Sequence, residues 1–305
     1  MIMKGEKAVS ALVLVICVVC YFYANIYQNK FSSTINGKLY AMSYFQMLWM
    51  GIAAVAFLIM ELVSDGLSFS ALTLQLAPIA GIFTILGGMS LLFAMTKGPL
   101  SLTILIFSMY IVIPPLMAMP ILGEHFSMSQ WIGLVLILIV IFLTNFDRDA
   151  VGKKYPRIWW LLCIGSVVFV GLSNFIMKYH QTMMPGEEQR EYAIVSYTCG
   201  IVLASVLGYI LKWFIDGKNK SDSYRFTKNG FFIPAVMVAL MQGGANLCNL
   251  YNASRMPAII LYPVSQLSTL MLTVVYGILV LKEKTTKVSV SCLLLGALAI
   301  VMMNF

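Results

Sequence analysis

The sequence predicts an all-α integral membrane protein with ten transmembrane helices, arranged as two inverted five-helix repeats. The first observation is composition: 60% of the 305 residues are apolar and only 10% are charged, whereas soluble domains carry about 25% charged residues. The second is a series of apolar runs near the ~20 residues that an α-helix needs to cross the hydrocarbon core. The third is a pattern that recurs in the two halves of the chain.

Ten apolar runs give the expected helices. The run after Lys4 and Lys7 resembles a signal peptide, but it is long and lacks a small-x-small cleavage site, so it is interpreted as helix 1. The fifth and tenth runs are close to the lower length limit. All are too long and too rarely alternating for barrel strands. The runs are 8–27, 40–61, 74–96, 100–122, 128–145, 158–178, 192–214, 231–252, 256–281 and 287–304.

The net charge of +8 is explained by membrane orientation, so no nucleic-acid partner is expected. Of the 20 basic residues, 15 fall on the side of the loops that follow helices 1, 3, 5, 7 and 9. The positive-inside rule places these loops in the cytoplasm and both termini outside. The pair Cys17 and Cys20 has a metal-like spacing, but all six cysteines lie inside apolar runs, which favours packing.

The repeat is visible where helices end. Leu122-Gly123-Glu124 closes one apolar run, and Leu281-Lys282-Glu283 closes another 159 residues later. We therefore expect a first repeat over residues 1–146, a polar linker over 147–157 and a second repeat over 158–305. Five is an odd number, so the second repeat enters the membrane with the opposite orientation. Such inverted repeats are typical of solute carriers, with a binding site near the bilayer midplane.

One stripe of amides marks a candidate site on helix 8. Gln242, Asn246 and Asn249 are spaced i, i+4, i+7 and fall on one ~60° face of a helix. An unpaired amide in lipid costs a few kcal/mol, so these side chains must face protein or a water-filled cavity. They are interpreted either as hydrogen bonds between helices or as a binding face for a neutral or zwitterionic solute.

Other polar residues extend this candidate substrate site. Tyr262 and Gln266 share a face of helix 9, beside Pro263, which frees a backbone carbonyl. The remaining candidates lie on helices 2, 4 and 6: Gln46, Trp49, Tyr110 and Asn174.

Charges within the apolar runs would be functional by default, and almost none are present. Glu124 and Glu283 hold equivalent places at helix ends. They are interpreted either as members of a gating or coupling ion pair, with Lys282 or Lys287 as the partner of Glu283, or as helix-end charges that face water or headgroups. The two histidines lack a metal-like spacing partner, and the chain shows no clusters of catalytic residues. We expect no metal, no cofactor and no enzymatic activity.

The ends of the repeats carry a family resemblance. The first reads Phe93-Ala94 to Pro99, Leu122-Gly123-Glu124 and Trp131-Ile132-Gly133; the second reads Leu250-Tyr251-Asn252 to Pro257, Tyr262-Pro263, Leu281-Lys282-Glu283 and Leu295-Gly296-Ala297. The whole chain resembles the drug/metabolite transporter superfamily, in its ten-helix EamA-like branch. Members usually have both termini in the cytoplasm, opposite to the charge count. The four-helix relatives have a glutamate within helix 1, and helix 1 here has no acidic residue.

The resemblance implies a secondary transporter of the plasma membrane that moves a small polar metabolite, such as an amino acid, amine, sugar or drug-like solute, by alternating access. The expected partners are the solute and the lipid bilayer, with the chain as a monomer or homodimer. Three alternatives remain open: a flippase for lipid-linked intermediates, an uncoupled facilitator and a non-transporting scaffold.

Overall fold

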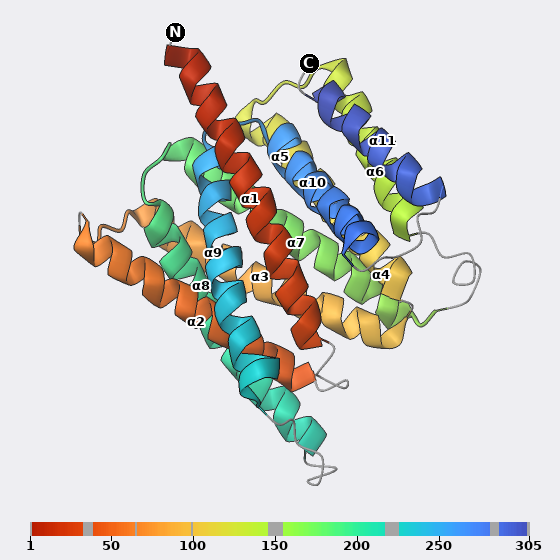
Figure 1. Ribbon diagram of the computed structural model, residues 1–305. Helices are drawn as coiled ribbons and strands as arrows, with labels where there is room; N and C mark the ends of the chain where they lie inside the picture. The colour runs from red at the N-terminus through yellow and green to blue at the C-terminus, as the bar shows by residue number, and fades with distance from the viewer. Residues whose placement is uncertain are drawn as a thin grey trace.

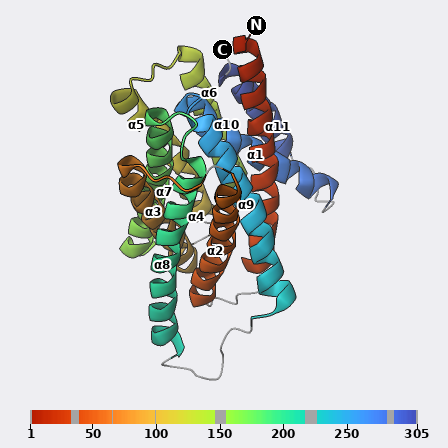
Figure 2. The ribbon, with the colours of Figure 1, turned by 90° about the vertical axis from the view of Figure 1, so that its left-hand side faces the viewer.

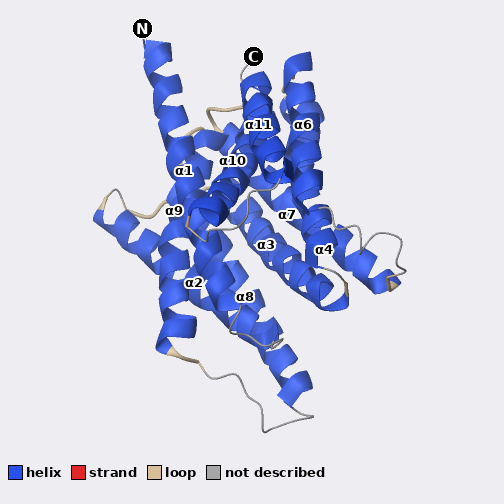
Figure 3. Cartoon of the chain, turned by 45° about the vertical axis from the view of Figure 1, so that its right-hand side comes forward, coloured by secondary structure: helices blue, strands red, loops and turns tan. Residues whose placement is uncertain are grey.

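In the computed structural model, residues 2–32, 39–64, 66–98, 100–145, 155–216, 226–280 and 287–303 are described. All regular structure within these ranges is helical (Figure 3). The elements are α1 (Ile2–Ser32), α2 (Leu39–Val63), α3 (Ala71–Lys97), α4 (Leu100–Phe107), the 3-10 helix η1 (Ser108–Val112), α5 (Ile113–Leu122), α6 (Met128–Asn145), α7 (Arg157–Met183), α8 (Gln189–Asp216), the π-helix η2 (Lys228–Phe232), α9 (Ile233–Ala253), α10 (Ala258–Leu279) and α11 (Lys287–Met303).

Eight helical segments in the described ranges are long and apolar enough to cross a membrane. The other two, Met128–Leu143 in α6 and Leu294–Met303 in α11, are shorter. The prediction of a multi-pass all-α membrane protein is thus confirmed, and eight of the ten predicted spanning helices reach the required length. The fourth span, Thr103–Leu122, is interrupted by η1, which precedes Pro114 and Pro115. Both prolines lack the N–H that a continuous helix would use.

Helices from the two halves of the sequence interleave. Helix α1 packs along α9, α2 along α8, α3 along α7 and α8, and α6 along α11 (Figures 1 and 2). Glycines allow the closest of these approaches. A Cβ on Gly81 of α3 would overlap the backbone carbonyl oxygen of Ser196 on α8. Among the described helices, the most extensive contacts are therefore those between the halves of the sequence.

The start of α1 and the end of α11 lie at the same end of the bundle (Figure 1). The short links around Glu124, Gly186 and Arg255 meet at this end: Glu124 accepts a hydrogen bond from the backbone N–H of Ala258, and Gly186 lies beside Arg255. We call this the terminal end. Many large apolar side chains, including Leu161, Val202 and Leu294, are exposed, as expected for surfaces solvated by lipid.

Candidate functional site

A cavity of about 340 Å³ lies between the helices and is lined by residues of α1, α2, α3, α4, η1, α7, α8, α9 and α10. Eight amide side chains and seven aromatic rings contribute to its wall. The amides are Asn25, Gln28, Gln46, Asn174, Gln242, Asn246, Asn249 and Gln266, and the aromatics are Tyr21, Trp49, Phe107, Tyr110, Tyr192, Tyr197 and Tyr262. No charged side chain is found among the described lining residues, so the cavity is polar but uncharged.

All nine residues that the sequence singled out for solute binding line this cavity. They are Gln46, Trp49, Tyr110, Asn174, Gln242, Asn246, Asn249, Tyr262 and Gln266. On α9 and on α10 the candidates are spaced so that they share one helix face, and both faces point into the cavity. The structure thus brings these residues together, while their role in binding a solute stays a prediction.

The amides of α9 also bond to neighbouring helices. Asn246 accepts a hydrogen bond from the Tyr21 hydroxyl of α1 (2.9 Å) and donates one to the Tyr197 hydroxyl of α8 (2.7 Å). Asn249 donates to Tyr21 (2.6 Å) and accepts from the Cys17 thiol (3.2 Å). The stripe therefore links three helices as well as lining the cavity, so both interpretations of it have a structural basis.

A second set of hydrogen bonds surrounds α10. The Tyr110 hydroxyl donates to Gln266 Oε1 (3.0 Å) and connects the broken fourth span to α10. The Tyr262 hydroxyl donates to the backbone carbonyl of Asn174 on α7 (2.6 Å). On α2, the Trp49 indole N–H donates to Gln46 Oε1. These bonds orient three aromatic rings of the wall.

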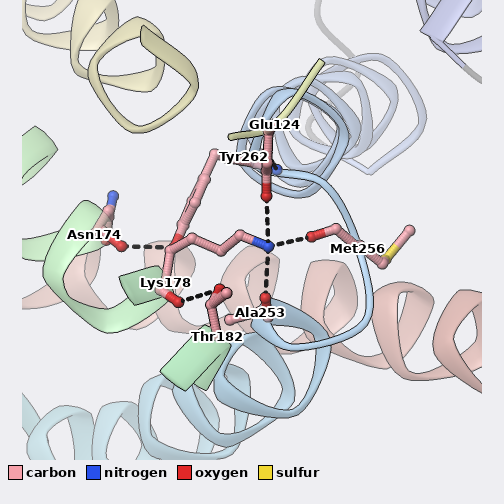
Figure 4. Close-up of polar contacts among 8 residues, drawn as sticks. Glu124, Asn174, Lys178, Thr182, Ala253, Met256 and Tyr262 are labelled. Atoms are coloured by element: carbon pink, nitrogen blue, oxygen red, sulfur yellow. Dashed lines mark hydrogen bonds and ion pairs between the residues drawn. The ribbon is translucent and has the colours of Figure 1, made fainter. Parts of the chain in front are cut away.

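A buried ion pair lies at the terminal end (Figure 4). Lys178 Nζ is 2.9 Å from Glu124 Oε1, and these side chains are 5% and 17% exposed. The ammonium also donates to the backbone carbonyls of Ala253 and Met256, each at 2.7 Å. Lys178 thus binds the carbonyl end of α9, while Glu124 accepts from the N–H of Ala258 at the start of α10, where a negative charge is favoured.

Glu124 is therefore not a charge that simply faces water. Its sequence equivalent, Glu283, lies outside the described residues. Sequence reasoning missed Lys178 as the partner because it assigned this lysine to the end of an apolar run. The sequence does contain a signal for the position of Lys178. This lysine follows the candidate Asn174 by four residues, which places both on one helix face, and α7 does continue beyond it to Met183.

A second polar cluster, also missed from the sequence, lies where α7 is linked to α8. Thr73 of α3 bonds to both His180 of α7 and Glu188 of the link, and Ser70 donates its backbone N–H and its hydroxyl to Glu188. Partial burial raises the pKa of the Glu188 carboxyl, but the hydrogen bonds from Thr73 and Ser70 outweigh this effect and hold the pKa below its usual value.

Comparison with known proteins is consistent with this architecture. The chain aligns with a solved crystal structure of another protein over 97% of this chain and 98% of that one, with a TM-score of 0.73 and 11% identity. This likeness shows the fold. No curated protein matches the sequence.

The second half of the sequence matches a family of known transporters. Residues 157–305, from the first residue of α7 to the end of the chain, match the EamA-like transporter family. With its apolar helices of spanning length, the chain is a multi-pass membrane protein, and its second half is similar to the EamA-like transporter family.

Proposed function

We propose that this protein is a secondary transporter of the plasma membrane that carries a small polar solute by alternating access. The observation that supports this most is the uncharged polar cavity, whose wall takes residues from helices of both halves of the chain. A cavity between two halves that can move against each other is the arrangement of many secondary transporters.

The packing of the helices supports an inverted repeat of residues 1–146 and 158–305. If each helix of the first half is paired with the helix five spans later, contacts occur in matching pairs. The contact of α1 with α9 corresponds to that of α7 with α3, and the contact of α2 with α9 corresponds to that of α8 with α3. The contacts of α2 with α8 and of α6 with α11 correspond to themselves. A two-fold axis in the membrane plane would produce this pattern.

The cavity wall is closed toward the terminal end. Tyr192 and Tyr262, which lie close to that end, are 4% and 3% exposed. Asn25 and Thr84, which lie further from it along α1 and α3, are exposed. We infer that the structure represents a state open to the opposite side, and that the reverse state requires the contacts at the terminal end to separate.

The chemistry of the wall indicates the class of solute. A full charge in a dry protein environment needs a partner charge, and the described wall provides none. Amide, hydroxyl and aromatic groups instead suit a neutral or zwitterionic solute that offers several hydrogen bonds and some apolar surface. Amino acids, sugars and uncharged drug-like solutes fit this wall, and an amine fits it only as the uncharged base.

Thermal unfolding of the detergent-purified protein, screened against amino acids, sugars, nucleobases and amines, would test the proposal. A compound that raises the midpoint is then assayed for uptake into proteoliposomes. We expect Asn246→Ala to lose uptake and the thermal shift while remaining folded, and Gln75→Ala, an exposed amide on α3, to behave as wild type. A facilitator would equilibrate the solute without accumulating it, whereas a lipid flippase or a scaffold would leave every soluble compound unbound. Full uptake by Asn246→Ala would reject the amide stripe as the site.

A further inference from the structure

His180 and the link between α7 and α8 form a closed hydrogen-bond network behind the cavity wall. The imidazole is fully buried, and its Nε2 lies 2.6 Å from Thr73 Oγ1. On the other side of the ring, Nδ1 lies 3.0 Å from Gln181 Nε2. The ring packs on Tyr192, a residue of the cavity wall, with 4.6 Å between ring centroids. The imidazole thus lies between the cavity and the surface link.

The partners of Gln181 fix the protonation state of this ring. The Gln181 nitrogen donates to the backbone carbonyl of Glu187 (3.0 Å). A carbonyl can only accept, so the amide nitrogen, and not the oxygen, is on this side. The Gln181 oxygen accepts from Gln189 Nε2 (3.2 Å). Because an amide nitrogen only donates, His180 Nδ1 must accept, and the ring proton is on Nε2. The ring is neutral in this arrangement.

A second proton on His180 would break the network. With hydrogen on Nδ1, two donors would face each other, and a buried donor without an acceptor is strongly unfavourable. Relief requires the Gln181 amide to turn over, and it then loses its bonds to both Glu187 and Gln189. These two residues belong to the link and to the first turn of α8, so protonation would release this segment from α7.

We propose that His180 is a proton-binding site. Protonation of its Nδ1 breaks the hydrogen bonds that hold residues 184–189 to α7 and thereby opens the terminal end. The inference rests on the proposed transport function, because it assigns the proton a role in alternating access. It adds a group that can titrate near neutral pH to a transporter whose described cavity wall has no carboxyl, imidazole or amine side chain.

The groups around His180 are compatible with this role. Glu188 lies beyond Thr73 and would attract a positive ring, Tyr192 faces the ring from α8, and α3 contributes the uncharged Thr73. The other charges at this end, in the part of the chain that the structure describes, include Glu187 and Arg255. They also include the pairs Lys178–Glu124 and Arg190–Glu61 with the neighbouring Glu191. Glu188 is not the sensor near neutral pH, because its lowered pKa keeps it ionised there.

Access to protons is provided by a surface groove of about 650 Å³ at the same link. Glu187, Glu188 and Gln189 line it together with Ser68 and Arg190. Water in this groove reaches the segment whose bonds hold the Gln181 amide, so a proton has to cross only this hydrogen-bonded layer to arrive at Nδ1.

Two measurements on the full chain in detergent micelles test the site without a solute. The chain has two histidines, so nuclear magnetic resonance of isotope-labelled imidazoles reports the state of His180, with His125→Gln and His180→Gln used for assignment. Hydrogen exchange measured by mass spectrometry reports opening of residues 184–191 between about pH 8 and about pH 5, the range in which histidine titrates.

We expect the hydrogen-exchange rate of this segment, corrected for intrinsic rates, to rise by up to about tenfold for each unit by which pH falls. This rise should begin at the pH at which His180 becomes charged. His180→Gln should stay closed across the range, because its amide can replace both hydrogen bonds of the neutral ring but cannot titrate. The matched variant His125→Gln, at an exposed histidine, should open as wild type. Gln181→Glu should raise the pH at which His180 becomes charged by about one unit, because a carboxylate accepts from Nδ1–H. The same variant should be open across the range, because a carboxylate cannot donate to the Glu187 carbonyl.

The proposal is overturned if His180→Gln opens with the wild-type midpoint, if His180 becomes charged without a change in exchange, or if the wild type neither titrates nor opens by about pH 5. If His180→Gln fails to fold, Gln181→Glu decides, because a segment that stays closed in that variant, or a His180 that becomes charged at the wild-type pH, contradicts the network. A protein that opens as expected but moves no solute would retain the proton site and reject the transporter.

Discussion

Lys178 Nζ lies 2.9 Å from Glu124 Oε1, and this pair connects α7 in the second half of the chain to the link between α5 and α6 in the first half. The same two side chains bind the backbone ends of α9 and α10. One ion pair thus fastens four segments at the terminal end, on the side where the cavity wall is closed.

Loss of the lysine should destabilise this closed arrangement. Lys178→Met leaves the mostly buried Glu124 carboxylate and two helix-end carbonyls without their partner, and we expect a loss of roughly 3 kcal/mol in the free energy of unfolding. Thermal or denaturant unfolding in detergent measures it. Adding Glu124→Gln should recover part of the loss, because it removes the unpaired charge. Lys228→Met, at an exposed lysine, is the matched control, and an equal loss in that variant would assign the effect to the charge of the whole protein.

The contact of α3 with α8 should tolerate no added methyl group at Gly81. The carbonyl carbon of Ser196 would lie only 2.9 Å from the new Cβ, and a backbone group cannot rotate away. We expect Gly81→Ala to cost roughly 1–3 kcal/mol through overpacking, measured by unfolding. In Gly51→Ala the nearest atom is a flexible Ile201 methyl at 3.9 Å, so this variant should remain as stable as wild type. Similar stability of both variants would contradict the close approach.

The hydrogen bonds that Glu188 accepts from Ser70 and Thr73 at the start of α3 should contribute less to stability in acid. The folded-state pKa of the Glu188 carboxyl is lowered, so this contribution to stability is fully present above the unfolded glutamate value of about 4.3 and is lost as pH falls through the folded pKa. We expect the unfolding temperature of wild type to decline below about pH 4. Glu188→Gln should start lower and decline less, whereas Glu187→Gln, on an exposed side chain, should follow wild type. Parallel curves for Glu188→Gln and wild type would show that these hydrogen bonds contribute nothing.

The sequence was sufficient for the class of fold and for the position of the cavity residues. Apolar runs report lipid exposure directly, and the spacing of Gln242, Asn246 and Asn249 defines one helix face wherever that helix packs. The partners of these residues could not be predicted, because Tyr21 and Tyr197 approach Asn246 from helices that are distant in sequence.

The polar contacts at the terminal end were less accessible to sequence reasoning. Glu124 was recognised as a helix-end charge, but its burial depends on Lys178, 54 positions later. His180 stood alone in the sequence, and its network comes from α3 and from Glu188, whose backbone has a positive φ of 47°. The apolar parts of α6 and α11 are shorter than a typical spanning helix. The length of an apolar run therefore does not decide whether these two helices cross the membrane.

The size of the cavity can be tested at Gly88, which lies in its wall. A Cβ at this position would have Gln46 Nε2 as its nearest neighbour, at 3.7 Å, so there is room for a larger side chain that extends into the cavity. We expect Gly88→Leu to fold normally and to lose solute-dependent thermal stabilisation and uptake, because leucine occupies the space of the solute. Gly165→Leu is the matched control: its nearest atom is Ser90 Oγ, also at 3.7 Å, but Gly165 does not line the cavity. Retained uptake by Gly88→Leu, or an equal loss of uptake in Gly165→Leu, would show that the solute is not transported through this cavity.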